Sequence, residues 1–214
     1  MSVGVVTVAV GDTYQAFMPR WAEAVAGLER PPDEVTIVVD RIGDELADEI
    51  QGILPDATFL YSRLTWEHHP QVLVNDAIRF TQTEWICRMD ADDRIYPHAL
   101  NPLDDVAEHI FGFGLRTSGG QELPAREVTA EGVLRSRANL MHAGSPFRRS
   151  VWEASSGYQD LMYEDWVFWR EAAAHGFTFG RSGTIDYEYV LGDHNVTRRV
   201  HHATEAAKVF TYVH

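Results

Sequence analysis

The 214-residue sequence has a single cysteine, a single lysine and no long apolar run. Cys87 has no partner within the chain, so an intrachain disulfide is excluded, and its apolar neighbours predict a buried, inert thiol. No segment approaches the roughly 20 apolar residues that span a bilayer, and the first residues lack the charged and apolar parts of a secretory signal. We therefore expect a cytoplasmic protein with no membrane span.

Positive charge is also scarce. The sequence has 18 Lys and Arg residues against 32 Asp and Glu, which gives a formal net charge of -14. Because phosphate contacts need clustered cations, this composition argues against a broad nucleic-acid-binding surface. The sequence also lacks the glycine-rich motifs of P-loop and dinucleotide-binding proteins, the nucleophile motif of α/β-hydrolases and the paired cysteines of a zinc site.

Apolar runs and helical patterns alternate along the first half of the chain. Their periodicity predicts buried strands at 3–10, 35–39, 58–61 and 85–89, and helices at 14–28, 44–54 and 70–80. Such alternation is typical of a mainly parallel, doubly wound α/β sheet. The second half is less regular, and there we expect helices at 97–109, 164–175 and 200–213, strands at 110–115 and 185–191, and a loop-rich stretch at 117–131.

The most informative segment is 85–93, where an apolar run ends in the carboxylates of Asp90, Asp92 and Asp93. Open α/β sheets bind ligands at the carboxyl ends of their strands. Mg²⁺ and Mn²⁺ prefer oxygen ligands and bridge one or two carboxylates to phosphate oxygens. An acidic triplet also occurs in many exposed turns, so the motif alone leaves a metal site and a solvated turn both open.

Three further features lie on either side of this acidic turn. Asp40 precedes it, at the end of the second strand, whereas Gly157-Tyr158 and Tyr163-Glu164-Asp165-Trp166, at a predicted helix start, come after it. With the acidic turn, they resemble glycosyltransferase family 2, from Val3 to about Thr197. The resemblance implies a GT-A fold in one domain spanning 1–214. Its nucleotide-sugar-binding half would be 1–95, its acceptor-binding and catalytic half 96–199, and a C-terminal helix would follow at 200–214.

The resemblance implies roles in the donor site for four residues of the first half. Asp40 would contact the uracil or ribose, and Asn75 would line the nucleotide pocket. Asp90 would hold the ribose and the water shell of a metal, and Asp92 would bind that metal directly. The sequence departs from the family after the first strand, which ends in Gly11 without the usual turn, and after Asp40, so the nucleobase contacts stay open.

In the second half, the resemblance implies that Asp165 is the catalytic base, with Glu164 beside it. The same two acids could instead only stabilise the first turn of a helix. His194 would be a second metal ligand, although it could be an exposed turn residue, and His201 or His202 could replace it. Two further sets of side chains are candidates for contact with substrate: Arg198 and Arg199 for the diphosphate, and Trp166 and Arg148 for the acceptor, with core packing as the alternative for Trp166.

The predicted activity is inverting transfer of a sugar from a nucleotide-diphosphate donor, expected to be a UDP-sugar, to an acceptor hydroxyl. Mn²⁺ or Mg²⁺ would stabilise the leaving diphosphate, and a carboxylate would act as general base. The acceptor stays open among a glycan, a lipid-linked sugar, a protein and a hydroxymethylated DNA base, and so does the oligomeric state. The alternatives are a non-catalytic sugar-nucleotide-binding module and a nucleotidyltransferase of related fold, although Gly11-Asp12-Thr13 lacks the basic loop of the latter.

Overall fold

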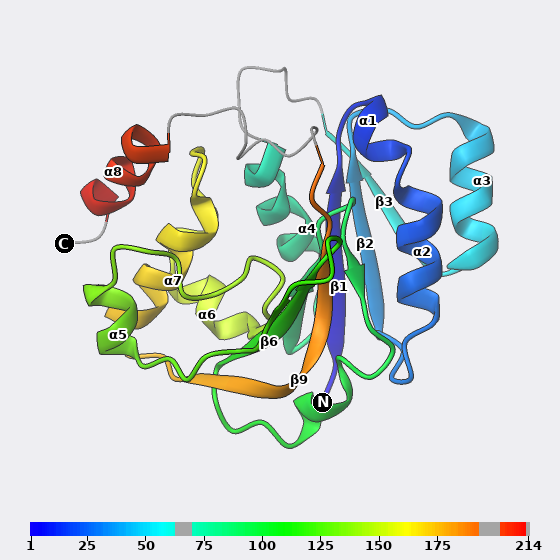
Figure 1. The fold of residues 1–214 in the computed structure, drawn as a ribbon. Coiled ribbons are helices and arrows are strands. Elements are labelled where there is room, and N and C mark those ends of the chain that lie inside the picture. Colours follow the sequence, from blue (N-terminus) through cyan, green and yellow to red (C-terminus); the bar gives the residue numbers. More distant parts are fainter. Residues whose placement is uncertain (63–69, 193–201, 213–214) are drawn as a thin grey trace.

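The computed structural model describes residues 1–62, 70–192 and 202–212. Its centre is a curved β-sheet with helices packed against it (Figure 1). The strand order is β3-β2-β1-β4-β8-β6-β9-β5, with β7 paired to β6. The strands are β1 (Val3–Ala9), β2 (Glu34–Val39), β3 (Thr58–Tyr61), β4 (Trp85–Arg88), β5 (Arg94–Ile95), β6 (Ile110–Thr117), β7 (Glu122–Leu123), β8 (Phe147–Arg148) and β9 (Phe179–Tyr189). The helices are α1 (Asp12–Gln15), α2 (Met18–Ala26), α3 (Asp44–Ile53), α4 (Val74–Phe80), α5 (Ala130–Arg135), α6 (Arg149–Ala154), α7 (Glu164–Ala174) and α8 (His202–Tyr212), with 3-10 turns η1 (Pro70–Leu73) and η2 (Asn101–Asp104).

The first half of the sheet is parallel. β1 lies between β2 and β4 and runs parallel to both, with Ala9 opposite Val39 and Val6 opposite Arg88. Asp40, which follows β2, and Asp90, which follows β4, therefore lie at the same edge of the sheet. β8 runs antiparallel to both β4 and β6, and β6 pairs in parallel with β9. The predicted mainly parallel, doubly wound α/β sheet is thus confirmed.

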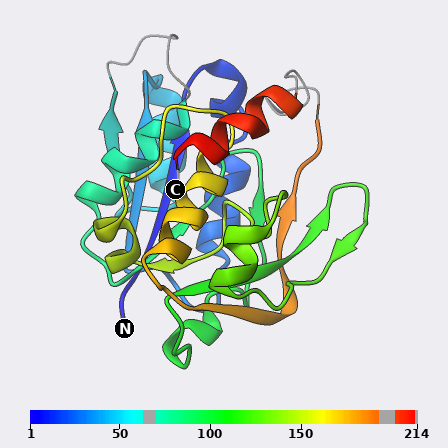
Figure 2. The same ribbon diagram turned by 90° about the vertical axis from the view of Figure 1, so that its left-hand side faces the viewer.

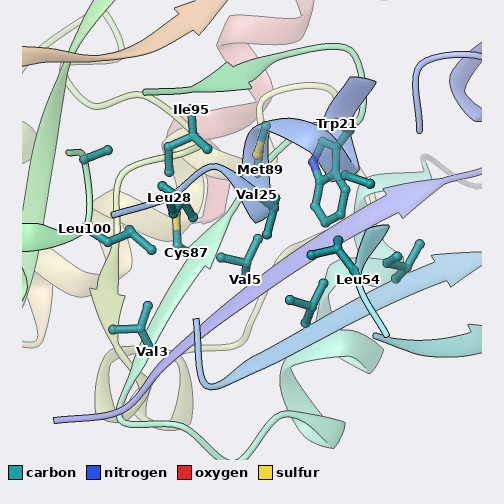
Figure 3. Close-up of a cluster of buried hydrophobic side chains, with 14 of the residues drawn as sticks. Val3, Val5, Trp21, Val25, Leu28, Leu54, Cys87, Met89, Ile95 and Leu100 are labelled. Carbon is teal, nitrogen blue, oxygen red and sulfur yellow. The ribbon is translucent and has the colours of Figure 1, made fainter. Parts of the chain in front are cut away.

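Helices cover both faces of this sheet (Figures 1 and 2). Adjacent residues of a strand point to opposite faces, so Val5 and Val6 belong to different buried clusters. Val5 packs with residues of α2 and α3, among them Trp21, and with Cys87, which is a buried free thiol as predicted (Figure 3). Val6 packs with residues of α4, α6 and α7 on the other face.

Several predicted elements of the second half differ from the structure. The helix predicted at 97–109 is wrong, because the segment contains only η2, with Pro102 at its start. Proline lacks the N–H that a continuing helix needs. The strand predicted at 185–191 begins earlier, at Phe179, and passes through Gly180 and Gly183. None of the helices in the described ranges is long and apolar enough to cross a bilayer.

The pairing of β6 with β9 changes register at Gly114. Gly112 lies opposite Arg181, whereas Gly114 lies opposite Ile185, so β9 has extra residues between these two pairs. The Gly114 N–H donates to the buried Asp186 carboxylate at 2.9 Å. A Cβ on Gly114 would collide with the backbone carbonyl oxygen of Thr184 on β9. Only glycine therefore fits at this bulge.

We expect Gly114→Ala to lower the free energy of unfolding by about 1–3 kcal/mol, because the backbone of β9 must move to admit the methyl group. Urea denaturation measures this loss. Gly183→Ala is the matched control, since a Cβ there would have no heavy atom within 4 Å, and its effect should stay within about 0.5 kcal/mol. Equal losses in the two variants would contradict the bulge argument.

Candidate active site

A cavity of about 320 Å³ opens at the carboxyl ends of β1 and β4. One side comes from the first half of the chain and includes Val10, Tyr14, Asp90 and Asp92. The opposite side comes from the second half, namely Asn139, Met141, His142, Ala143, Met162, Tyr163, Glu164, Asp165 and Tyr189. The cavity therefore brings together the two acidic motifs that the sequence separates by about 70 residues, at the sheet edge where α/β proteins bind ligands.

The acidic turn after β4 is held by its backbone. The Asp93 N–H donates to the Asp90 carbonyl oxygen at 3.1 Å, and Arg20 of α2 donates to the Asp92 carbonyl oxygen at 2.7 Å. The Asp93 carboxylate is buried and accepts from the Val190 N–H at 2.8 Å, so this acid ties the turn to the end of β9. Asp90 and Asp92 are left as the two carboxylates of the turn that line the cavity.

Arg88, the last residue of β4, joins the two acidic motifs. The residue is 2% exposed, and its side chain donates to Asp90 Oδ1 at 3.0 Å and to Glu164 Oε1 at 2.7 Å. The guanidinium also lies 5.1 Å from the ring centroid of Tyr158. Sequence reasoning missed this residue, although an arginine inside an apolar strand is itself a signal. A buried charge requires partners of opposite sign.

Glu164 and Asp165 begin α7 and both line the cavity. The Asp165 carboxylate accepts from the Asn139 side-chain amide at 2.7 Å and from the Trp166 N–H at 2.8 Å. Burial raises the pKa of Glu164 to about 8, although Arg88 opposes the shift. Burial also raises the pKa of Asp165, and Arg88 and the two hydrogen bonds counteract it. The cavity therefore holds acids with a strengthened affinity for protons.

His142 lines the same cavity as a neutral ring. Its Nδ1 accepts from the Gly144 N–H at 3.0 Å, so the remaining ring proton lies on Nε2. The ring centroid lies 4.7 Å from that of Tyr187 and 5.7 Å from that of Tyr189. Burial lowers the pKa of His142 to about 4. No motif in the sequence indicates His142 or Asn139, because both lie in an irregular segment.

Asp40 holds the loop after β1. Its Oδ1 accepts from the Gly11 N–H and from Gln15 Nε2, both at 3.1 Å. Gly11 has a φ of 78°, which favours glycine. Val10 of this loop and Tyr14 of α1 line the cavity, so Asp40 shapes the wall on the side of the first strand. Its contact with a donor stays a prediction.

Asn75 has a different position from the predicted one. Its Oδ1 accepts from the Tyr158 N–H and from Trp152 Nε1, both at 2.9 Å, and its Nδ2 donates to the Tyr158 carbonyl oxygen at 2.8 Å. Among the described residues that line the cavity, Val74 is present but Asn75 is not. Asn75 therefore fixes the turn that contains Gly157, in place of the predicted nucleotide contact.

The two predicted acceptor residues are also engaged elsewhere. Trp166 is 4% exposed and packs its ring against Phe210 of α8, at 5.5 Å between centroids. Arg148 pairs with Glu84 and lies 4.7 Å from the ring centroid of Trp85, at the start of β4 and thus at the opposite end from Asp90. The structure therefore gives both side chains packing contacts in place of the predicted acceptor contacts.

Four predicted substrate or metal contacts, His194, Arg198, Arg199 and His201, lie outside the described residues, as does the side chain of His202. Within the described part of the chain, no group of three or more His, Cys, Asp and Glu side chains is placed to hold a metal. Mg²⁺ and Mn²⁺ bound with a nucleotide need only one or two carboxylates, because phosphates and waters complete the shell. The carboxylates of Asp90 and Asp92 on the cavity wall fit such an ion.

Comparison with known proteins adds to this geometry. The sequence profile of the family described as Glycosyl transferase family 2 matches residues 5–111, which include most of β1, all of β2 to β4 and the acidic turn. No curated protein matches the sequence.

Solved structures match most of the chain at low identity. S. aureus TarS 1–349 in complex with UDP-GlcNAc has a TM-score of 0.75 at 16% identity, over 94% of this chain and 62% of that chain. A crystal structure of S. aureus TarS gives 0.70 at 16%, over 89% and 37%. The mannosyltransferase PcManGT from Pyrobaculum calidifontis, in complex with GDP-Man and Mn²⁺, gives 0.69 at 15%, over 98% and 63%. The chain thus shares their fold and spans less than two thirds of their lengths.

Removal of the buried cation should be costly. We expect Arg88→Met to lower the free energy of unfolding by about 1–3 kcal/mol, because the buried Glu164 loses the donor that its carboxyl group accepts from. The double variant Arg88→Met/Glu164→Gln should recover part of that loss. Denaturant unfolding of the wild type, the two single variants and the double variant measures this recovery. Strictly additive losses would show that the two side chains do not interact.

The raised pKa of Glu164 predicts a pH dependence of stability. The usual pKa of a glutamate is 4.5, and that of Glu164 in the folded protein is about 8. Between these two pH values, the folded protein binds the Glu164 proton more tightly than the unfolded chain does. The free energy of unfolding should therefore fall as the pH rises through this range, by at most about 1.4 kcal/mol per pH unit from this group. Glu164→Gln should show a shallower slope in urea unfolding at pH 5.5 and 8. Identical slopes would contradict the assignment.

Proposed function

The chain belongs to glycosyl transferase family 2, and we propose that it transfers a sugar from a nucleotide diphosphate to an acceptor hydroxyl with inversion at the anomeric carbon. One observation carries the proposal: a single cavity holds the acidic turn after β4 and the two acids that begin α7, with Arg88 between them. One side of such a cavity can hold a donor diphosphate while the other activates an acceptor.

The donor side is the wall formed by β1 and β4. We assign Asp92 as the direct ligand of Mn²⁺ or Mg²⁺ and Asp90 as a contact to the ribose and to the water shell of the ion. When bound, the ion would neutralise charge that develops on the leaving diphosphate. The UDP-GlcNAc complex of TarS and the GDP-Man and Mn²⁺ complex of PcManGT support a sugar nucleotide and a metal. A UDP-sugar is the proposed donor, and Asp40, His194, Arg198 and Arg199 stay proposed contacts.

The acceptor side is the wall that contains Asp165. In the proposed reaction, this carboxylate takes the proton of the acceptor hydroxyl as the oxygen forms a bond to the anomeric carbon, and the diphosphate leaves with the electron pair of the broken C–O bond. Asn139 orients one carboxylate oxygen at 2.7 Å, and the first turn of α7 favours the ionised form. Glu164 contacts Arg88 at 2.7 Å, so it supports the site through that cation.

Two substitutions separate the roles of the two walls. Asp165→Asn should lower the rate of transfer by about 10²–10⁴-fold, because it removes the general base, and should leave nucleotide affinity intact. Asp92→Asn should abolish the metal-dependent part of nucleotide binding. Isothermal titration with UDP, GDP and dTDP, with and without Mn²⁺, measures the affinity and identifies the nucleotide.

Asp56→Asn is the control, because Asp56 is an exposed acid in the turn after α3. It should bind the nucleotide as the wild type does. If none of the three nucleotides binds to the wild type in the presence of Mn²⁺, the proposed function is overturned. Metal-dependent binding that survives Asp92→Asn would overturn the assignment of the ligand alone.

A further inference from the structure

A second cavity, of about 420 Å³, adjoins the candidate active site. The two cavities share the side chains of Asn139, Met141 and His142, which thus form a partition between them. The remaining walls of the second cavity come from β6, from β7 with the loop that follows it, and from the segment that leads to β8. Its volume lies within the usual range of small-molecule sites.

The walls of the second cavity are mainly apolar. Phe113, Leu115, Leu123 and Pro124 line it, with Arg126 as the one charged residue of the lining, and Leu123 is one of the large apolar side chains that the described residues expose, at 41%. An apolar side chain at the rim of a concave site is available to a ligand that buries it. The lining therefore favours a ligand part with little polarity.

In the described part of the chain, one polar atom in the wall of the second cavity, Ser145 Oγ, has no hydrogen-bond partner. Ser145 is fully buried and lines the cavity, and its Oγ makes no hydrogen bond to the described residues. Buried hydroxyls normally have a partner, and an exception calls for an explanation. The Ser145 hydroxyl has no exposed surface, so it adds no accessible polar group and the wall of the second cavity stays apolar at this depth.

Polar groups gather on the partition itself. Asn139 donates to Asp165 at 2.7 Å, and the ring of His142 carries its proton on Nε2, since its Nδ1 accepts from the Gly144 N–H. A molecule that crosses the partition would meet the proposed base at one end, hydrogen-bonding groups in the middle and apolar walls at the other end. This order of chemistry matches an acceptor with a hydroxyl-bearing head and an apolar group.

We propose that the second cavity is an acceptor subsite for an aryl or alkyl group attached to the sugar that carries the reactive hydroxyl. This inference rests on the proposed function, since it assumes that Asp165 faces the acceptor. It selects amphiphilic acceptors, such as aryl glycosides or alkyl-linked sugars, over wholly polar glycans. The aryl and alkyl classes share the apolar chemistry that the walls recognise.

The test compares three glucosides, namely methyl, hexyl and 4-methylumbelliferyl β-D-glucopyranoside. Their affinities for the wild-type protein are measured by isothermal titration in the presence of Mn²⁺ and of the nucleotide that binds. We expect the hexyl or the 4-methylumbelliferyl compound to bind at least about tenfold more tightly than the methyl compound, because several apolar carbons leave water. The tighter of the two distinguishes an alkyl from an aryl acceptor. Equal affinities for all three compounds would overturn the proposal.

Two variants localise the effect. Leu123→Ser should weaken binding of the preferred compound by about tenfold, whereas Leu191→Ser should not, since Leu191 is also 41% exposed but does not line the cavity. Ala125→Trp, which fills the cavity, should remove the advantage over the methyl compound. An advantage that persists in both cavity variants would place the apolar group elsewhere and overturn the assignment.

The titration of the wild type with nucleotide and Mn²⁺ separates this proposal from the one on which it rests. If the nucleotide does not bind, both proposals fail. If it binds and the three glucosides have equal affinities, the acceptor subsite fails and the donor site stands.

Discussion

The buried guanidinium of Arg88 is the constraint on which the site depends. A charge that is 2% exposed must have partners, and here one carboxylate comes from the turn after β4 and another from the start of α7. The position of α7 relative to the sheet is therefore fixed by electrostatics as well as by packing. The stacking on Tyr158 brings in the turn that Asn75 fixes from α4. One cation thus orders elements from both halves of the chain around a single cavity.

Much of the fold could be predicted from the sequence where apolar periodicity is long. The strands at 35–39 and 58–61 and the helix at 44–54 lie close to their predicted bounds, because the apolar residues of each recur at the spacing of that element. The second half could be predicted less well. β5, β7 and β8 contain two residues each, and such short strands exist only because a partner strand is already in place. Periodicity within the sequence contains no information about that partner.

The candidate site shows the same division. The positions of Asp90, Asp92, Glu164 and Asp165 on the cavity wall could be predicted, because these acids lie at a strand end and a helix start that the apolar pattern marks. Asn139 and His142 could not, since the irregular segment that contains them is positioned by tertiary contacts. The structure gives Asn75, Trp166 and Arg148 contacts away from the cavity for a related reason. Each has a side chain long enough to face the cavity or to pack away from it, and only the neighbours decide between the two.

The partition between the two cavities has a consequence for the evolution of substrate range. Residues 138–142 belong to no helix or strand, so their replacement would leave the sheet pairing and the acids of the site in place, provided that position 139 keeps an amide for Asp165 and position 141 keeps an apolar side chain for the core. Selection could thus change the loop at 138–142, which separates the two cavities, while the acids of the candidate active site are retained. If the second cavity binds the acceptor as proposed, acceptor recognition and catalysis could change independently, and the loop at 138–142 is the boundary between them.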